Sequence, residues 1–239
     1  MLGLFTGRSG GVSGDPFGTL NLSYGVGDDP AAVRRNRDLV GQAVRPGPDR
    51  LSWLRQVHGT AVVQITETAG TPTAAPDADP RADAQFTGSA ALAVGALAAD
   101  CAPVLIADPV ARLVGAAHAG RPGLAAGVVP ALIAAMSAAG ADPGRMHAAI
   151  GPAICGQCYE VPAAMRDQVA AAVPESACVT AAGTPGIDLR TGLLAQLARF
   201  GVSAVSIDDR CTAETAELFS YRRDGRTGRL TGLVWLAPC

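Results

Sequence analysis

Two histidines and one cysteine of this chain stand where apolar stretches end, and such residues can do chemistry. His58 follows Leu-Arg-Gln-Val and precedes Gly59, and His118 follows Leu-Val-Gly-Ala-Ala and precedes Ala-Gly. Cys101 follows Ala-Leu-Ala-Ala-Asp and precedes Ala-Pro. Because Gly and Pro turn the chain out of a strand, we expect the three side chains to be displayed at strand ends.

Two imidazoles and one thiolate form a donor set that suits Zn²⁺ or a copper ion. Three protein ligands leave a fourth position for water or substrate, which is the arrangement of catalytic metal sites. A structural interpretation is also open, because a buried cysteine packs like a small apolar side chain and a histidine before glycine can cap a turn. No short metal-binding motif joins the three residues, so their spacing leaves both interpretations open.

Composition excludes several classes of function. The 239 residues have a formal net charge of −2, which argues against a nucleic-acid partner that needs a broad basic face. All 19 basic residues are arginines, so there is no Schiff-base or Walker lysine, and phosphate must be bound by arginine or backbone N–H groups. No apolar run reaches membrane-spanning length and no signal-peptide pattern is present. We therefore expect a cytoplasmic protein without a membrane partner, and a monomer because no apolar surface stripe stands out.

Apolar runs and helix caps together predict the elements that must position these residues. Strands are predicted at 51–57, 60–66, 91–98, 103–107, 112–117, 146–150, 202–207 and 230–236. Asp29 and Pro30 suit the start of a helix that runs to about Val44, and further helices are predicted at 123–139, 162–173 and 188–200. Strands outnumber helices and hairpin-like pairs mix with strand–helix units, which indicates a mixed α/β or α+β fold forming a single domain over 1–239.

Several short motifs follow one another along nearly the whole chain. They are Phe5-Thr-Gly-Arg8, Leu20-Asn21-Leu, Gln56-Val-His58-Gly59, Ala-Asp83-Ala, Ala-Asp100-Cys101-Ala-Pro, Ala-His118-Ala-Gly120, Gly151-Pro-Ala-Ile-Cys-Gly-Gln-Cys-Tyr-Glu160 and Phe219-Ser-Tyr-Arg-Arg-Asp-Gly. In this order they resemble the motifs of the family that includes the bacterial YfiH and YlmD proteins and mammalian FAMIN, once described as polyphenol oxidases or laccases.

The resemblance implies a fold, an activity and a set of site residues. The expected fold is a YfiH-like layered sandwich with mixed sheets, similar to that of a bacterial toxin deamidase. The expected activity is metal-dependent phosphorolysis of purine nucleosides to free base and ribose 1-phosphate, with adenosine deamination at the same site. The substrates would be phosphate and adenosine or inosine, with guanosine and methylthioadenosine as further candidates. The metal would be zinc, with copper as the alternative, and its ligands correspond to His58, Cys101 and His118.

Three further residues are candidate catalytic groups. Arg121 stands at a strand-to-helix turn beside His118, where N–H groups and its guanidinium could bind phosphate. Gln56 could hydrogen-bond the base or a metal-bound water, and Asp100 could orient a ligand or transfer a proton. Each also has a structural alternative, as a solvated arginine, a strand glutamine bonded to backbone and a turn-capping carboxylate. The family usually has Trp-Arg-Gly where this chain has Arg121-Pro-Gly, which leaves the phosphate and base contacts undecided.

The glycine-rich N-terminal segment supplies the candidate substrate-binding residues. The resemblance implies that Ser13 and Asn21 line the site, and Arg8 is a further candidate, beside Arg121, for holding phosphate. In such a loop, however, Ser and Asn commonly form turns.

Two alternatives to this activity remain open. Cys101 could be the nucleophile of a metal-free hydrolase or deamidase with His118 as its base, or the metal could be purely structural in a protein that is not an enzyme. A multicopper laccase needs more imidazoles than three histidines supply. Cys155 and Cys158 form a C-x-x-C motif, which we interpret as two free thiols in a turn because no second such motif accompanies it.

Overall fold

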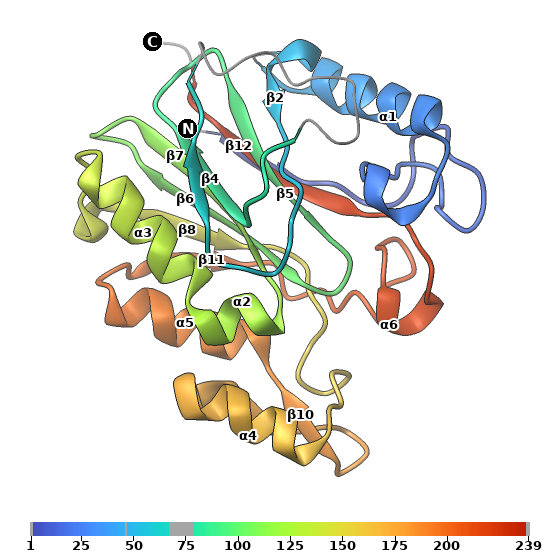
Figure 1. The fold of residues 1–239 in the computed structure, drawn as a ribbon, viewed down its shortest axis with the longest axis vertical. Helices are drawn as coiled ribbons and strands as arrows, with labels where there is room; N and C mark the ends of the chain where they lie inside the picture. Colours follow the sequence, from blue (N-terminus) through green and yellow to red (C-terminus); the bar gives the residue numbers. More distant parts are fainter. Residues whose placement is uncertain (1, 46, 67–78, 238–239) are drawn as a thin grey trace.

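Two mixed β-sheets form the centre of the molecule, and helices cover their outer faces (Figure 1). The structure is a computed structural model that describes residues 2–45, 47–66 and 79–237. The first sheet has four strands in the order β1-β12-β5-β2, namely Leu2–Phe5, Leu230–Trp235, Ala93–Ala98 and Leu51–Ser52. β1 and β5 pair antiparallel with β12, whereas β2 runs parallel to β5.

The second sheet has six strands, and it carries two of the candidate metal ligands at one end. Its order is β11 (Ala204–Ile207), β8 (His147–Ile150), β6 (Ala102–Asp108), β7 (Leu113–Ala119), β4 (Ala84–Thr87) and β3 (Val62–Gln64). The four central strands pair antiparallel, and the two edge strands pair parallel to their neighbours. Both sheets are therefore mixed, as the sequence predicted.

The two sheets pack face to face across an apolar core. Leu105 and Val114 of the second sheet meet Val94 and Val234 of the first in one buried cluster. Ile106, the next residue of β6, points to the other face and joins the core beneath the helices. Since neighbouring residues of a strand face opposite sides, β6 is buried on both faces, which explains its continuous apolar sequence.

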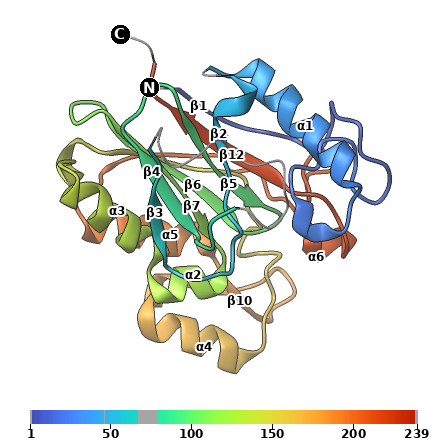
Figure 2. The same cartoon turned by 45° about the horizontal axis from the view of Figure 1, so that its top comes forward.

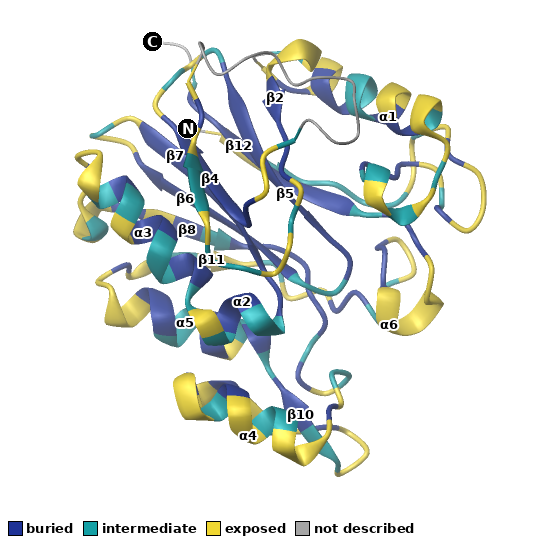
Figure 3. Ribbon diagram, in the orientation of Figure 1, coloured by how far each residue is buried: buried dark blue, intermediate teal, exposed yellow. Residues whose placement is uncertain are grey.

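Helices complete four layers. α1 (Pro30–Ala43) packs on the outer face of the first sheet, and the segments over the second sheet are α2 (Arg121–Ala126), α3 (Val128–Ala138) and α5 (Leu189–Arg199) (Figure 2). The remaining elements are α4 (Ala163–Ala172), the hairpin β9 (Ala177–Val179) and β10 (Pro185–Ile187), α6 (Tyr221–Asp224), and short 3₁₀ turns at Tyr24–Val26, Pro48–Arg50, Pro143–Arg145 and Pro174–Ser176. Figure 3 shows buried central strands and helices exposed on their outer sides.

Most predicted elements are confirmed, and two of them differ from the prediction in an informative way. α1 begins as expected, with the Asp29 side chain accepting from Ala31 N–H and Pro30 in the first turn. The helix predicted at 123–139 is instead two helices, because Gly127 adopts a left-handed conformation (φ 85°) between α2 and α3. The strand predicted at 51–57 is wrong beyond Ser52, where the chain leaves the sheet.

The strands β1, β4, β9 and β10 and the short helix α6 were not predicted, and β4 shows how such an element is missed. Gln85 and Thr87 interrupt its apolar pattern, yet both are fully buried. The Gln85 amide donates to the backbone carbonyls of Ser52 and Gly95, and the Ser52 hydroxyl donates to Gln85. A buried polar side chain is tolerated where all its hydrogen bonds are made, so local hydropathy misses this strand. Within the described ranges, no helix is long and apolar enough to cross a membrane.

Candidate functional site

The structure brings together His58, Cys101 and His118, which are widely separated in sequence. One potential ligand atom from each lies within 4.8 Å of the others. The Cys101 sulfur is 3.9 Å from His58 Nε2, and the two imidazole rings meet edge to face with centroids 4.8 Å apart. Two nitrogens and one sulfur thus converge on a single point.

Different local structures place the three side chains. His118 is the penultimate residue of β7, and Cys101 lies in the tight connection between β5 and β6, so both stand at strand ends as predicted. That connection turns at Asp100, which has a positive φ of 81°. The expectation for His58 is wrong: β2 ends at Ser52, and His58 lies in an exposed loop with a φ of 61°.

Asp83 organises this loop, although the sequence suggested no role for it. Its fully buried carboxylate accepts hydrogen bonds from the backbone N–H groups of Val57, His58 and Gly59, at 2.7–3.2 Å. It also lies 2.9 Å from His118 Nδ1. Because the Asp83 carboxylate accepts a hydrogen bond from Nδ1 of His118, the other ring nitrogen, Nε2, faces Cys101 and His58. The only signal in the sequence was the Ala-Asp83-Ala motif.

The electrostatics of the cluster favour a thiolate. Burial raises the pKa of Cys101, but the adjoining imidazoles of His118 and His58 outweigh it and bring the pKa down to about 6. Burial lowers the pKa of His118, but Cys101 and Asp83 outweigh it and raise the pKa to about 9. The pKa of Asp83 is also lowered, because hydrogen bonds from His118, Gly59 and Val57 overcome its burial. At neutral pH Cys101 and His118 thus form a thiolate–imidazolium pair, and a metal ion bound by His118 would displace its proton.

Gly120 permits the close approach of these groups. A Cβ atom at this position would lie 2.7 Å from the Cys101 sulfur and 2.9 Å from Cδ2 of His58. Contacts this short do not occur for real Cβ atoms. The glycine two residues after His118 is therefore a requirement of the site as well as a turn residue.

The cluster opens into a cavity of about 720 Å³. Its lining combines aromatic and cationic side chains, namely Tyr24, Tyr159, Tyr221, Arg37, Arg55, Arg222 and Arg229. Arg37 is already engaged: it donates to the Leu22 carbonyl, pairs with Asp79 at 3.6 Å and stacks on Tyr24 and Trp53.

Two other arginines bring positive charge to this cavity. Arg222 lies over the Tyr159 ring at 5.3 Å, while Arg229 is half-buried and donates to the Thr227 and Gly228 carbonyls. Burial lowers the pKa of Arg229, and the nearby Cys101 and Asp100 oppose this effect. Both arginines thus line the same cavity as the cluster.

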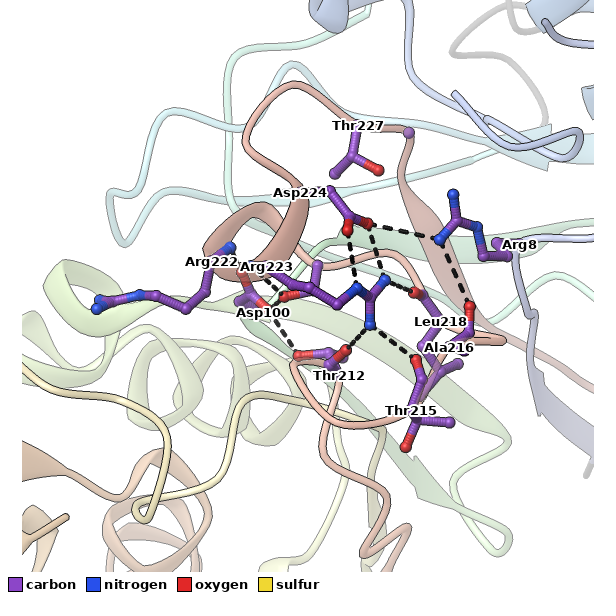
Figure 4. A network of polar contacts seen from close by, with 12 residues as sticks. Arg8, Asp100, Thr212, Thr215, Ala216, Leu218, Arg222, Arg223, Asp224 and Thr227 are labelled. Atoms are coloured by element: carbon purple, nitrogen blue, oxygen red, sulfur yellow. Dashed lines mark hydrogen bonds and ion pairs between the residues drawn. The ribbon is translucent and has the colours of Figure 1, made fainter. Parts of the chain in front are cut away.

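Gln56 and Asp100 line the cavity, but their polar atoms are bonded to the protein. The Gln56 amide donates to the Leu97 carbonyl at 2.8 Å, and its oxygen accepts from Leu97 N–H at 2.7 Å. The Asp100 carboxylate accepts from the hydroxyls of Thr212 and Ser220 and from Arg222 N–H, at 2.6–2.7 Å (Figure 4). These contacts match the structural alternatives: Gln56 is bonded to backbone, and Asp100 fastens the start of α6.

The other predicted contacts lie behind the cavity wall. Arg121 is the first residue of α2 and lies near Tyr159, where its charge opposes the rise in the pKa of Tyr159 that burial causes. Arg8 packs on Phe219 and pairs with Asp224 at 3.5 Å, within the network shown in Figure 4. Among the described residues that line the cavity, neither arginine is included.

Ser13 and Asn21 are buried in a separate polar network. Both donate to one carboxylate oxygen of Asp28, and Asn36 donates to Ser13. Asn21 also donates to the Ser23 carbonyl and accepts from Arg229 N–H. The described lining residues include Ser23 and Arg229 but neither Ser13 nor Asn21. Because the side-chain polar atoms of Asn21 are used internally, the two residues support the wall that we expected them to form.

The donor set fits a transition metal ion. A thiolate and two neutral imidazole nitrogens are ligands that Zn²⁺ and copper ions share. The fixed Nδ1 contact of His118 with Asp83 is the outer hydrogen bond that metal-binding histidines usually make. With three protein donors on the wall of an open cavity, a fourth position would face the substrate.

Comparison with known proteins decides the family. The model of the family described as multi-copper polyphenol oxidoreductase laccase matches residues 3–237. The chain belongs to this family. It is 50% identical to a purine nucleoside phosphorylase of Streptomyces coelicolor over 97% of this chain and 94% of the relative. It is 52% identical to a purine nucleoside phosphorylase of Streptomyces griseus over 97% and 93%.

Solved structures agree with the fold. YlmD from Geobacillus stearothermophilus superimposes with a TM-score of 0.91 at 30% identity, covering 99% of this chain and 92% of that one. A Neisseria meningitidis protein superimposes with a TM-score of 0.87 at 39% identity, covering 99% and 94%. The predicted YfiH-like sandwich with mixed sheets is therefore confirmed. The family description names several coppers, but this chain has only three histidines for such sites.

Proposed function

We propose that this protein catalyses the phosphorolysis of purine nucleosides in the cavity beside His58, Cys101 and His118. The observation that carries the proposal is the lining of this cavity, where a candidate metal centre, aromatic rings and arginines share one space. A cavity of about 720 Å³ has the size of sites for small organic ligands. Relatives about 50% identical over nearly the whole chain carry the name purine nucleoside phosphorylase, which supports the same chemistry here.

The lining suggests how the substrates would be held. Tyrosine rings such as Tyr24 and Tyr159 offer flat faces for a purine base. Arg229 and Arg222 offer guanidinium donors for phosphate, in place of the Arg121 and Arg8 contacts expected from the sequence. Arg121 would act indirectly, through its positive charge near the Tyr159 hydroxyl.

The reaction needs phosphate and nucleoside to meet with their charges balanced. A phosphate oxygen attacks C1′ of the ribose while the bond from C1′ to the purine nitrogen breaks. The bonding electron pair leaves with the purine, which takes up a proton, and ribose 1-phosphate remains. Arg229 would lower the barrier by holding phosphate close to the sugar, since positioning and electrostatic stabilisation supply most of such rate enhancements.

His58, Cys101 and His118 would hold the metal, with zinc as the first candidate and copper as the second. When bound, it supplies a localised positive charge that can polarise an oxygen of a substrate or of water. Asp83 would fix the ring of His118 and the loop of His58 in the ligating orientation. Adenosine deamination at the same centre is the second activity that we propose.

The decisive assay is chromatography of products from zinc-loaded protein with adenosine or inosine, with and without phosphate. We expect free base and ribose 1-phosphate only when phosphate is present, and inosine from adenosine in its absence if deamination also occurs. Cys101→Ala should lose phosphorolysis, whereas the matched variant Cys178→Ala, outside the cavity lining, should keep it. No turnover of either nucleoside by metal-loaded protein would contradict the proposal.

One observation favours a second candidate, a metal-free hydrolase or deamidase. The His118 imidazole lies beside the Cys101 sulfur. The two imidazoles outweigh burial and lower the pKa of Cys101 to about 6, which makes it a thiolate at neutral pH. Full activity after treatment with a chelator, together with labelling of Cys101 by iodoacetamide, would support this chemistry over phosphorolysis. Unfolding on metal removal without any turnover would instead indicate a purely structural metal.

A further inference from the structure

A second cluster of metal-ligand atoms lies away from the cavity centre. Cys155, Cys158, Cys211 and Glu214 place one donor atom each within 4.8 Å of one another. The sequence predicted two free thiols in a turn; Cys155 and Cys158 do lie in a turn and form no disulfide with each other. The fold adds Cys211 and Glu214, which come from a segment more than fifty residues further along the chain.

Backbone geometry holds the two halves of this cluster together. Cys155 and Cys158 flank a tight turn in which the N–H groups of Cys158 and Tyr159 both donate to the Cys155 carbonyl at 3.0 Å. The strand segment before this turn pairs with the second half through a parallel bridge between Ala153 and Cys211. Cys211 then begins its own turn, in which Glu214 N–H donates to the Cys211 carbonyl at 3.2 Å. The donors thus come in two pairs, each spaced by two residues.

An arginine clamps the same two segments. The Arg190 guanidinium of α5 donates to the carbonyl of Ala153 at 2.7 Å and to that of Arg210 at 2.5 Å. The cluster is therefore held by backbone pairing and by the half-buried Arg190 rather than by flexible side chains alone. Such a preformed set of donors lowers the entropic cost of binding an ion.

Hydrogen bonds around Cys211 suit a metal-bound sulfur. Cys155 N–H donates to the Cys211 sulfur at 3.3 Å. The Cys155 and Cys158 sulfurs lie beside it in the same cluster. Three thiolates at this spacing would need a cation to compensate their charge.

We propose that Cys155, Cys158, Cys211 and Glu214 form a second, structural zinc site. Three thiolates and one carboxylate are donors that zinc accepts, and four protein ligands close its usual tetrahedral shell. Thiolate-rich sets select against Mg²⁺ and Ca²⁺, which prefer oxygen. A disulfide between Cys155 and Cys158 would engage only two of the three converging sulfurs. Zinc binding releases the thiol protons and needs no oxidant.

The site would stiffen one wall of the substrate cavity. Ile154 and Tyr159, on either side of the first turn, line that cavity. Next to Cys211, the Thr212 hydroxyl donates to Asp100, the residue before the candidate ligand Cys101. Zinc at the second site would thus fix the position of the first centre without contributing a ligand to it.

The test counts zinc in the full chain, after expression in zinc-supplemented medium. In a Cys101→Ala background, which disables the first centre, we expect about one zinc per chain by mass spectrometry of the metal. Adding Cys158→Ser should remove it. Adding Cys178→Ser should leave it, because Cys178 lies outside the four-donor cluster although its thiol donates to the neighbouring Gly156 carbonyl.

Two variants of the exposed Glu214 test the site without removing a cysteine, in case loss of a cysteine prevents folding. Glu214→Cys should slow the loss of zinc to a chelator about 10-fold or more, and Glu214→Gln should speed it. Cobalt substituted at this site should give sulfur-to-cobalt absorption that weakens in Cys158→Ser. Absence of zinc from the Cys101→Ala protein, or a Cys155–Cys158 disulfide that forms equally with and without zinc, would overturn the proposal.

Discussion

Asp83→Asn is the substitution that best separates positioning of the metal ligands from fold stability. The Asp83 carboxylate is fully buried and binds the backbone of three loop residues as well as Nδ1 of His118. Asparagine has nearly the same shape, but it offers one acceptor oxygen and presents an NH₂ group where the second oxygen was. Whichever way the amide turns, N–H groups of the loop or of His118 lose their acceptor.

The size of the effect follows from these contacts. One oxygen of Asp83 serves His58 N–H and His118 Nδ1, both at 2.9 Å, and the other serves Gly59 N–H at 2.7 Å. If the amide oxygen keeps the first pair, the Gly59 contact is lost and the rest become bonds to a neutral acceptor. Since a hydrogen bond to a charged group contributes about 1.5–3 kcal/mol, we expect a loss of about 3 kcal/mol in the free energy of unfolding.

Zinc affinity should fall when Asp83 is substituted and should not fall when a buried carboxylate far from the site is substituted. Removing an outer hydrogen bond to a ligating histidine lowers metal affinity roughly 10- to 100-fold. Competition with a chelator at constant pH measures this change, and urea unfolding of the metal-free protein measures stability. The control is Asp108→Asn, another fully buried carboxylate, which binds three backbone N–H groups and Arg145. It ends β6, roughly 20 Å from the Cys101 end of that strand.

Both variants should lose similar stability, but only Asp83→Asn should lose zinc affinity. Equal affinity losses in the two variants would show that general destabilisation, and not the orientation of the ligands, controls metal binding. Unchanged affinity in Asp83→Asn would refute the assigned role of the carboxylate outright.

Three further outcomes are expected. Hydrogen bonds from backbone N–H groups and Arg145 overcome burial and lower the pKa of Asp108 to about 2. The ionised carboxylate therefore stabilises the fold fully above about pH 4, and this contribution is lost as the pH falls towards 2. The free energies of unfolding of wild type and Asp108→Asn, measured as a function of pH, should converge there. Gly120→Ala should lower zinc affinity at least roughly 10-fold in chelator titration, since its Cβ would meet the Cys101 sulfur at 2.7 Å. Arg229→Gln should raise the KM for phosphate about 10-fold and leave that for the nucleoside nearly unchanged; an effect on the nucleoside alone would place phosphate elsewhere.

Much of the local structure could be read directly from the residues. The cap of α1 and the apolar runs of β5, β6, β7 and β12 obey rules that act within a few residues. The same is true of Cys101 and His118, because a strand end followed by a turn is a local pattern. For this reason the approximate fold class and two of the candidate ligands were predictable without coordinates.

The roles of Gln56 and Asp100 could not be separated in that way. The residues that bind them, Leu97 and Thr212, are 41 and 112 positions away. Whether a polar side chain faces a substrate or is consumed by backbone depends on which distant segment folds against it. Residue type and neighbours leave that choice open.

By itself, the sequence determined the family, the order of most elements and the supply of soft ligands, because these follow from residue type and short-range pattern. Only the tertiary structure decided that Asp83 holds the loop of His58 and that Cys211 joins Cys155 and Cys158. It also decided that Ser13 and Asn21 support the cavity wall. These outcomes depend on contacts between remote segments, which form only when two packed sheets fix their relative positions.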